Sequence, residues 1–272
     1  MFFKAVERRD DLGKRNNAVL LYSLHVWTIA EIEIRKLRKD PFELIMRAVQ
    51  PILWLLVFGE AFGRLRAVPT GHVSYLAFLT PGILSQSITF ISIFYGITII
   101  WERDMGVLQK FLSTPISRSA FILGKMLAAS VRAFAQAVII CFVAMGIGVH
   151  LDWKIGHIVG VILTVILGAA FFAGLSMVLA SLMRTRERMM GIGQLITMPL
   201  FFSSNALYPI SIMPTWLKVV ATMNPMSYLV DALRGLLLDM PYHLILDWGV
   251  LTSAILVMLF LSTRLFRYRM AS

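Results

Sequence analysis

Long apolar runs alternate with short polar segments along most of this chain. The apolar runs are about 20 residues or longer, which lets a helix cross a hydrocarbon core about 30 Å thick. We therefore expect an all-α integral membrane protein with six transmembrane helices in a single membrane domain, residues 41–272. The expected spans are residues 41–62, 72–100, 124–149, 157–183, 189–207 and 244–265.

The segment before the first apolar run, residues 1–40, is polar and then amphipathic. Residues 1–17 are charged and lack an apolar core, so they do not form a secretory signal peptide. Over residues 18–39, apolar positions recur with helical spacing and basic residues gather at the end, which is typical of a helix in the membrane interface. A first spanning helix is the alternative, and its charged residues make it costly. Glu33 is an exception to the pattern, because it falls on the apolar face.

The segment before the last apolar run is too polar and too often interrupted by proline to be one straight span. One short helix is predicted to begin at Pro214, and a second follows Asn224 and Pro225, a favourable N-cap and first helical residue. Both are too short to cross the bilayer. We expect two re-entrant or interfacial helices on the outer side, within about residues 209–240.

The polar segment at residues 101–123 separates two long apolar runs. After Gly106, apolar residues recur with helical spacing, and a turn rich in Thr, Pro and Ser leads back to the membrane. The pattern predicts a short helix parallel to the membrane, at about residues 101–119, with a charged face toward the cytoplasm. An ordinary amphipathic connector is the alternative, although the segment is long for a loop between spans.

Composition and charge agree with a membrane protein. Hydrophobic residues make up 58% of the chain and charged residues 15%, against about 45–50% and about 25% in soluble domains. The net charge of +11 does not require a nucleic-acid partner, because basic residues collect on the cytoplasmic side of membrane proteins. Only five of the 26 lysines and arginines fall in expected outer segments, namely Arg64, Arg66, Lys154, Lys218 and Arg234. We therefore expect both termini to be cytoplasmic.

The sequence contains no pattern typical of a catalytic or metal site. Gly124-Lys125 is not followed by Ser or Thr and has no glycine five residues before it, so no phosphate-binding loop is predicted. The five histidines show no metal-ligand spacing, and the single cysteine, Cys141, forms no intrachain disulfide. We expect neither catalysis nor a bound cofactor in this chain.

A few polar residues fall inside the expected spans. Ser85, Gln86 and Thr89 make the second span polar, and they either hold helices together or line a transport pathway. Arg132 is the charged residue expected deepest in the membrane. It has either a structural role or contact with an anionic substrate, and the sequence leaves both possibilities open. No acidic residue lies at mid-membrane, which argues against a carrier driven by protons.

Two motifs stand out in the sequence. The first is the run E-R-D-x-G-x-L-x-x-x-L-x-T-P-x-S-R at residues 102–118, followed by ILGK at residues 122–125. The second combines Tyr208-Pro209, the run MPTWL at residues 213–217, Asn224-Pro225, Tyr228 and the run DALR at residues 231–234. Together they cover nearly the whole chain, and in this order they resemble the ATP-binding-cassette type-2 permease family, which includes daunorubicin-type drug-resistance permeases and nodulation-factor exporters. Gln109 departs from the family, in which an acid is common there.

The resemblance implies a permease that dimerises, with itself or a related half, and pairs with two copies of an ATP-hydrolysing subunit that binds ATP and magnesium. It implies a coupling helix that docks in that subunit and an outer helix pair that closes the exit of the pathway. The implied coupling residues are Glu102, Arg103, Asp104, Gly106, Leu108, Leu112, Thr114, Pro115 and Arg118. The implied exit residues are Pro209, Pro214, Trp216, Asn224, Pro225, Tyr228 and Arg234.

The expected function is outward transport of a hydrophobic or amphipathic substrate, such as a drug, antibiotic or lipid-like molecule, across the inner or plasma membrane. Export of a polysaccharide or glycolipid is one alternative. A secondary carrier driven by an ion gradient is another, and a non-transporting membrane anchor is a third.

Overall fold

A computed structural model describes residues 18–39, 42–65, 73–113, 116–183 and 185–269. Within these ranges all regular structure is helical. The α-helices are α2 (Ala18–Lys39), α3 (Phe42–Leu65), α4 (Tyr75–Phe94), α5 (Gly96–Asp104), α6 (Val107–Leu112), α7 (Arg118–Gly146), α8 (Ile155–Leu182), α9 (Arg186–Phe202), α10 (Thr215–Met223), α11 (Pro225–Leu238) and α12 (Leu244–Arg269). A 3₁₀ turn, Ile210–Ile212, precedes α10.

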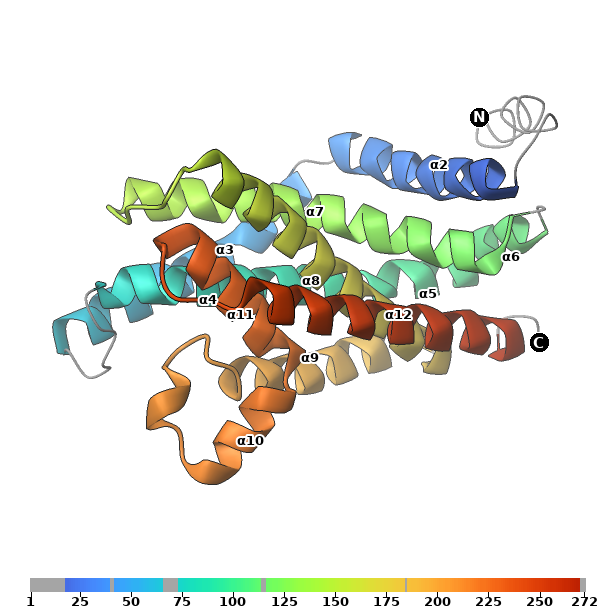
Figure 1. Ribbon diagram of the computed structural model, residues 1–272. Coiled ribbons are helices and arrows are strands. Elements are labelled where there is room, and N and C mark those ends of the chain that lie inside the picture. Colours follow the sequence, from blue (N-terminus) through green and yellow to red (C-terminus); the bar gives the residue numbers. More distant parts are fainter. Residues whose placement is uncertain (1–17, 40–41, 66–72, 114–115, 184, 270–272) are drawn as a thin grey trace.

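The long helices run along a common direction, so that their ends gather in two groups (Figure 1). The short helix α6, the start of α7 and the end of α12 lie at one end of the molecule. The helices α10 and α11 lie toward the other end, with the α7–α8 loop. This separation matches the expected division between inner and outer segments.

In the described part of the chain, five helical segments are long and apolar enough to cross a membrane: Leu44–Gly63, Tyr75–Asp104, Arg118–Gly146, Ile155–Leu182 and Leu244–Phe266. The all-α membrane fold predicted from the sequence is therefore confirmed. The span expected at residues 189–207 corresponds to α9, which has 17 residues, the lower end of the range for a crossing helix. The sixth crossing thus stays a prediction. The amphipathic helix α2 is not among the five segments.

The helix α4 lies at the centre of the bundle and packs against α3, α7, α8 and α11. Leu79, Ile83, Leu84 and Ile88 are completely buried on it. The helix continues through Pro81. Gly82 allows this part of α4 to approach the backbone of Ala206, because a side chain there would overlap the Ala206 carbonyl.

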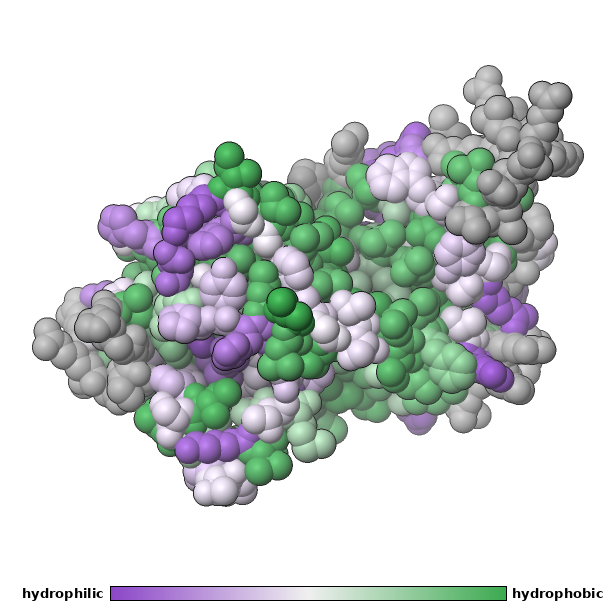
Figure 2. All heavy atoms as spheres, in the orientation of Figure 1, coloured by the Kyte–Doolittle hydropathy of each residue, from purple (hydrophilic) through white to green (hydrophobic). Residues whose placement is uncertain are grey.

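On the face shown in Figure 2, the surface is largely apolar over the middle of the bundle, and hydrophilic residues gather toward both ends. On α12, for example, Leu256, Val257 and Phe260 are each more than half exposed. Apolar surface of this extent is not stable in water, whereas lipid chains cover it without cost. The surface therefore supports the assignment of these helices to the membrane.

Candidate functional site

A buried charge cluster joins three helices near the end of the molecule that carries α6. At its centre is Lys125 of α7, whose side chain is 1% exposed. Its Nζ donates hydrogen bonds to Glu33 Oε1 on α2, at 2.9 Å, and to Glu102 Oε2 on α5, at 2.7 Å. A single ammonium group thus links α2, α5 and α7.

Two further cations complete the charge cluster. Lys36 Nζ lies 2.7 Å from Glu33 Oε1 and 3.0 Å from Glu102 Oε1. Arg132 Nη2 lies 3.5 Å from Glu33 Oε2, and its guanidinium is 5.4 Å from the centre of the Tyr95 ring. Two buried carboxylates therefore face three cations, which compensates the charges that folding removes from water.

The pKa of Glu33 reports this environment. Burial alone would raise it, but the charges of Lys125 and Lys36 and the hydrogen bonds they donate outweigh burial and lower the pKa to about 2. Glu33 is therefore ionised at neutral pH. The charged form of Lys36 is favoured as well. Burial would lower the pKa of Lys36, but the carboxylates of Glu33 and Glu102 raise it.

The close packing of α2 on α7 brings the charge cluster together. At Gly124, a Cβ atom would lie 2.7 Å from Ile29 Cβ and 2.9 Å from the Val26 carbonyl oxygen, so only glycine permits this approach. Glu33 follows Ile29 by about one helical turn on the same face and so points toward α7. The apolar face of α2 thus packs against protein, and Glu33, the charged residue on that face, contacts the buried Lys125.

The predicted coupling segment comprises the end of α5, Gly106 and α6. Gly106 has a positive φ of 69°, which L-residues rarely adopt, and this conformation turns the chain between the two helices. Leu108 anchors α6, being 1% exposed, whereas Gln109 and Lys110 on the opposite side are exposed. The segment therefore has a buried attachment and a free polar face.

The charged residues of the coupling segment differ in their surroundings. The sequence analysis predicts that Glu102 contributes to a partner contact, but its carboxylate is enclosed by Lys125 and Lys36. Arg103 Nη1 donates to the Met183 carbonyl, at 3.0 Å, and Asp104 lies 3.5 Å from Arg186. These contacts tie the segment to the α8–α9 connection.

Other implied coupling residues are only partly defined. Arg118 is the first residue of α7, after the N-cap Ser117. Thr114 and Pro115, and the side chain of Leu112, lie outside the described residues.

The implied exit residues organise the turns around α10 and α11. Pro209 precedes the 3₁₀ turn, and Pro214 is the N-cap of α10. Asn224 caps α11 by accepting from the Met226 N–H, with Pro225 as the first helical residue, as the sequence predicts. Trp216 of α10 is 68% exposed.

The helix α11 is further fixed by polar contacts toward the end of the bundle opposite α6. Tyr228 donates its hydroxyl hydrogen bond to the Thr222 carbonyl, at 2.6 Å. Arg234 is buried, donates to the Asn205 carbonyl at 2.8 Å and places its guanidinium 3.9 Å from the centre of the Phe78 ring. The Tyr228 contact attaches α11 to α10, and the Arg234 contacts attach it to α4 and to the segment that follows α9. Whether α10 and α11 are re-entrant stays a prediction.

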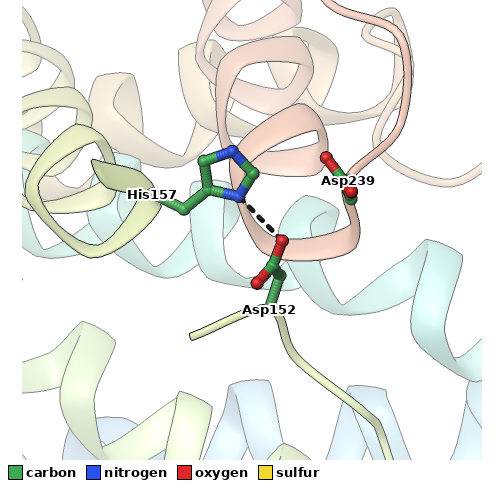
Figure 3. Close-up of side chains that lie close together, drawn as sticks. All are labelled: Asp152, His157 and Asp239. Atoms are coloured by element: carbon green, nitrogen blue, oxygen red, sulfur yellow. Dashed lines mark ion pairs between the residues drawn. The ribbon is translucent and has the colours of Figure 1, made fainter. Parts of the chain in front are cut away.

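Asp152, His157 and Asp239 come together toward the end of the molecule opposite α6, with possible ligand atoms within 4.8 Å of one another (Figure 3). His157 Nδ1 lies 3.0 Å from Asp152 Oδ2. Lys154 Nζ lies 3.0 Å from Asp152 and 2.8 Å from Asp239, and its hydrogen bond lowers the pKa of Asp152. Since an ammonium group already compensates both carboxylates, we interpret the group as an ion-pair cluster. The sequence analysis missed it because Asp239 is distant in the chain.

The residues considered for a transport pathway differ in their hydrogen bonding. Ser85 donates to the Pro81 carbonyl of its own helix, at 2.8 Å, as expected for a packing residue. Gln86 and Thr89 are buried on α4, and among the described residues Gln86 Oε1 and Thr89 Oγ1 have no hydrogen-bond partner. Arg132 contacts Glu33, which gives it a structural role.

A bundle of long apolar helices, to which a buried charge cluster fixes α2 and the end of α5, defines a multi-pass membrane protein. Residues 25–238 match the family model for ABC-2 type transporters. The chain therefore belongs to the ABC-2 type transporter family, which confirms the resemblance seen in the sequence.

Three relatives illustrate the family. The chain is 30% identical to the transport permease ycf38 of Cyanophora paradoxa, over 74% of this chain and 70% of that protein. It is 26% identical to the daunorubicin resistance ABC transporter permease protein DrrB1 of Streptomyces coeruleorubidus, over 82% and 77%. It is 28% identical to nodulation protein J of Rhizobium meliloti (strain 1021), over 81% and 84%.

Proposed function

We propose that this chain is the permease subunit of an ABC exporter, which moves a hydrophobic or amphipathic substrate outward using ATP hydrolysed by a separate subunit. The match to ABC-2 type transporters over residues 25–238 is the observation that carries this proposal. The names of the relatives include drug-resistance permeases, which supports an amphipathic substrate. The chain itself supplies the membrane pathway.

The proposed complex contains two ATP-binding-cassette subunits, which bind ATP and magnesium, and a second permease, either another copy or a related half. It lies in the inner or plasma membrane with both termini of this chain in the cytoplasm. The exposed face of α6, with Gln109 and Lys110, docks in the ATPase subunit. This face is available because Leu108 and Glu102 hold the opposite side of the segment against the bundle.

The coupling is mechanical. When ATP binding brings the ATPase subunits together, the docked α6 moves with them. The charge cluster fixes the end of α5 to α7 and α2, so the motion passes to the spans on both sides of the coupling segment instead of being absorbed by a loose loop. The two permeases then alternate the access of a pathway between them.

The first test is co-purification with an ATP-binding-cassette subunit, identified by a G-x-x-x-x-G-K-[ST] loop and expressed with this chain. Lys110→Glu should weaken retention of that subunit by about tenfold, since a reversed charge at a docking surface costs affinity. Lys218→Glu on α10, at the opposite end of the molecule, is the matched control and should have no effect.

Two results would contradict the proposal. ATP binding by the purified permease alone would place the energy source in this chain. Transport that survives inactivation of the ATPase subunit but stops when the ion gradient is collapsed would favour a secondary carrier.

A further inference from the structure

A cavity of about 140 Å³ lies between α3, α4 and α7. Its floor is formed by five buried residues, Pro51, Gln86, Ser87, Ile91 and Gln136. Its rim is formed by Met46, Arg47, Gln50 and Phe90, of which the first three are exposed. The cavity thus opens to the outside of the bundle beside α3.

The polar groups of the lining favour one kind of ligand chemistry. Three amides, a hydroxyl and a guanidinium line the cavity, and no carboxylate is among the described residues around it. The Gln136 amide donates to the Leu44 carbonyl, at 3.1 Å, and accepts from the Ala48 N–H, at 3.2 Å. The amides of Gln50 and Gln86 therefore remain for a ligand. Amides both donate and accept hydrogen bonds and therefore suit hydroxyl groups. Among the described residues around the cavity, a cationic head would find no opposite charge, whereas the guanidinium of Arg47 at the rim is compatible with an anionic head.

Gln86, which lines the cavity, carries a polar atom that is unsatisfied and is itself enclosed by protein. Its side chain is only 4% exposed, and its Oε1 has no hydrogen-bond partner among the described residues. A buried acceptor without a partner is costly, and a ligand donor removes that cost. Because the terminal torsion of glutamine is broad, a rotation presents either end of the amide to the cavity.

The size of the cavity limits how much of a ligand it holds. A volume near 140 Å³ is close to that of a cavity which binds benzene, about 150 Å³. It is smaller than the about 300–1,000 Å³ of sites that enclose a drug-sized molecule. Only a head group or one ring fits. The rest of an amphiphile would lie on the exposed apolar surface of α3, where Val49 and Leu53 are 45% and 53% exposed.

We propose that this cavity binds the hydroxylated, uncharged or anionic head of an amphipathic molecule, with its tail on α3, and discriminates against cationic heads. The proposal rests on the proposed export function, of which it names the substrate class. A bilayer lipid and a transported amphiphile share this chemistry, and the test separates them.

The test measures protection of a thiol at the rim in the full chain, reconstituted in phosphatidylcholine nanodiscs with Cys141→Ala as background. Met46→Cys places the thiol on the rim, and Ile45→Cys is the matched control, because both native side chains are 56% exposed but only Met46 lines the cavity. At a free concentration of about four times its Kd, octyl glucoside should slow maleimide labelling of the Met46→Cys thiol about fivefold, because only unoccupied sites react. Octyltrimethylammonium should not slow it, and the Ile45→Cys thiol should respond to neither probe.

Gln86 variants show whether the head group of the ligand is recognised inside the cavity. Gln86→Leu should abolish protection by octyl glucoside, and Gln86→Glu should transfer protection to octyltrimethylammonium. Equal protection of both thiols by both probes, or protection that survives Gln86→Leu, would overturn the proposal, as would no protection at all.

Two further arms identify the source of the ligand and separate the two proposals. Nanodiscs of phosphatidylglycerol that protect the Met46→Cys thiol without added glucoside would identify a bilayer lipid, and stimulation of the partner's ATPase by octyl glucoside would identify a transported amphiphile. Retention of the ATPase subunit is measured on the same preparations. A complex that forms without selective protection refutes the cavity proposal alone, whereas selective protection in a chain that retains no ATPase refutes the export proposal.

Discussion

At the residue scale, Lys125 is the most constrained charge in the described part of the chain. It is buried at 1% exposure between two carboxylates on different helices. Removing one member of a buried ion pair leaves the other charges uncompensated, which costs more than the pair contributes. The substitution most informative for the charge cluster is therefore at this lysine.

We expect Lys125→Met to lower the free energy of unfolding by about 3 kcal/mol, because Glu33 and Glu102 then share only Lys36 and Arg132 as partners. Thermal unfolding of the purified permease measures the loss. Lys110→Met removes the same group from the exposed face of α6 and should leave stability unchanged. Partial recovery in the double variant Lys125→Met, Glu102→Gln would show that the uncompensated carboxylate causes the effect.

The pH dependence of stability should show the contribution of the ionised Glu33 side chain. Its pKa is lowered from 4.5 to about 2 in the folded chain, so its contribution is complete above pH 4.5 and is lost as the pH falls toward 2. A shift of this size corresponds to about 3 kcal/mol. Unfolding measured between pH 6 and pH 3 should show a smaller acid dependence in Glu33→Gln than in the parent chain. An identical slope in both chains would mean that Glu33 is not paired in this way.

At the element scale, the contact between α2 and α7 depends on Gly124. An alanine in a helix is normally about 0.5–1 kcal/mol more stable than glycine, but a Cβ at residue 124 would overlap Ile29. We therefore expect Gly124→Ala to destabilise the chain by about 1–3 kcal/mol through overpacking. Gly146→Ala, at the end of the same helix with open space around it, should be neutral or stabilising. Equal shifts of the melting temperature in both variants would show that close packing at Gly124 does not stabilise the contact between α2 and α7.

The helices themselves could be predicted from the sequence, because each helix has its own pattern of apolar residues and end caps. The range 18–39 expected for the amphipathic helix coincides with α2, and the cap at Asn224 and Pro225 opens α11 where expected. The coupling segment, α10 and α11 also fall within their expected ranges. Periodicity and capping depend on neighbouring residues, so they are readable without the fold.

The contacts between helices could not be predicted in the same way. Periodicity places Glu33 on the apolar face of α2 but does not identify the group it meets, which is Lys125, 92 positions further along the chain. Glu102 belongs to a motif that implies docking, yet its carboxylate points into the bundle, since the fold, not the motif, decides which side of α5 is covered. The cavity beside Gln86 likewise arises only when α3, α4 and α7 are assembled.

At the scale of the whole molecule, the distribution of charge predicts the orientation of the chain. Basic residues concentrate in the segments near α6 and the end of α12, and the positive-inside rule places that end in the cytoplasm. The coupling segment must lie on this side for the proposed function to work, because ATP is hydrolysed there. The orientation thus links the charge pattern to the energy source.

Thiol labelling from one side of the membrane tests this orientation in Cys141→Ala chains. Trp153→Cys, in the α7–α8 loop where Trp153 is 53% exposed, should react with an impermeant maleimide in intact cells. Ser113→Cys, at the exposed end of α6, should react only after the membrane is permeabilised. The two loops flank α7, a helix of 29 residues, so opposite accessibility also shows that α7 crosses the bilayer. Labelling of both thiols in intact cells, or the reverse order, would place α6 where no cytoplasmic ATPase could dock and would exclude the coupling mechanism.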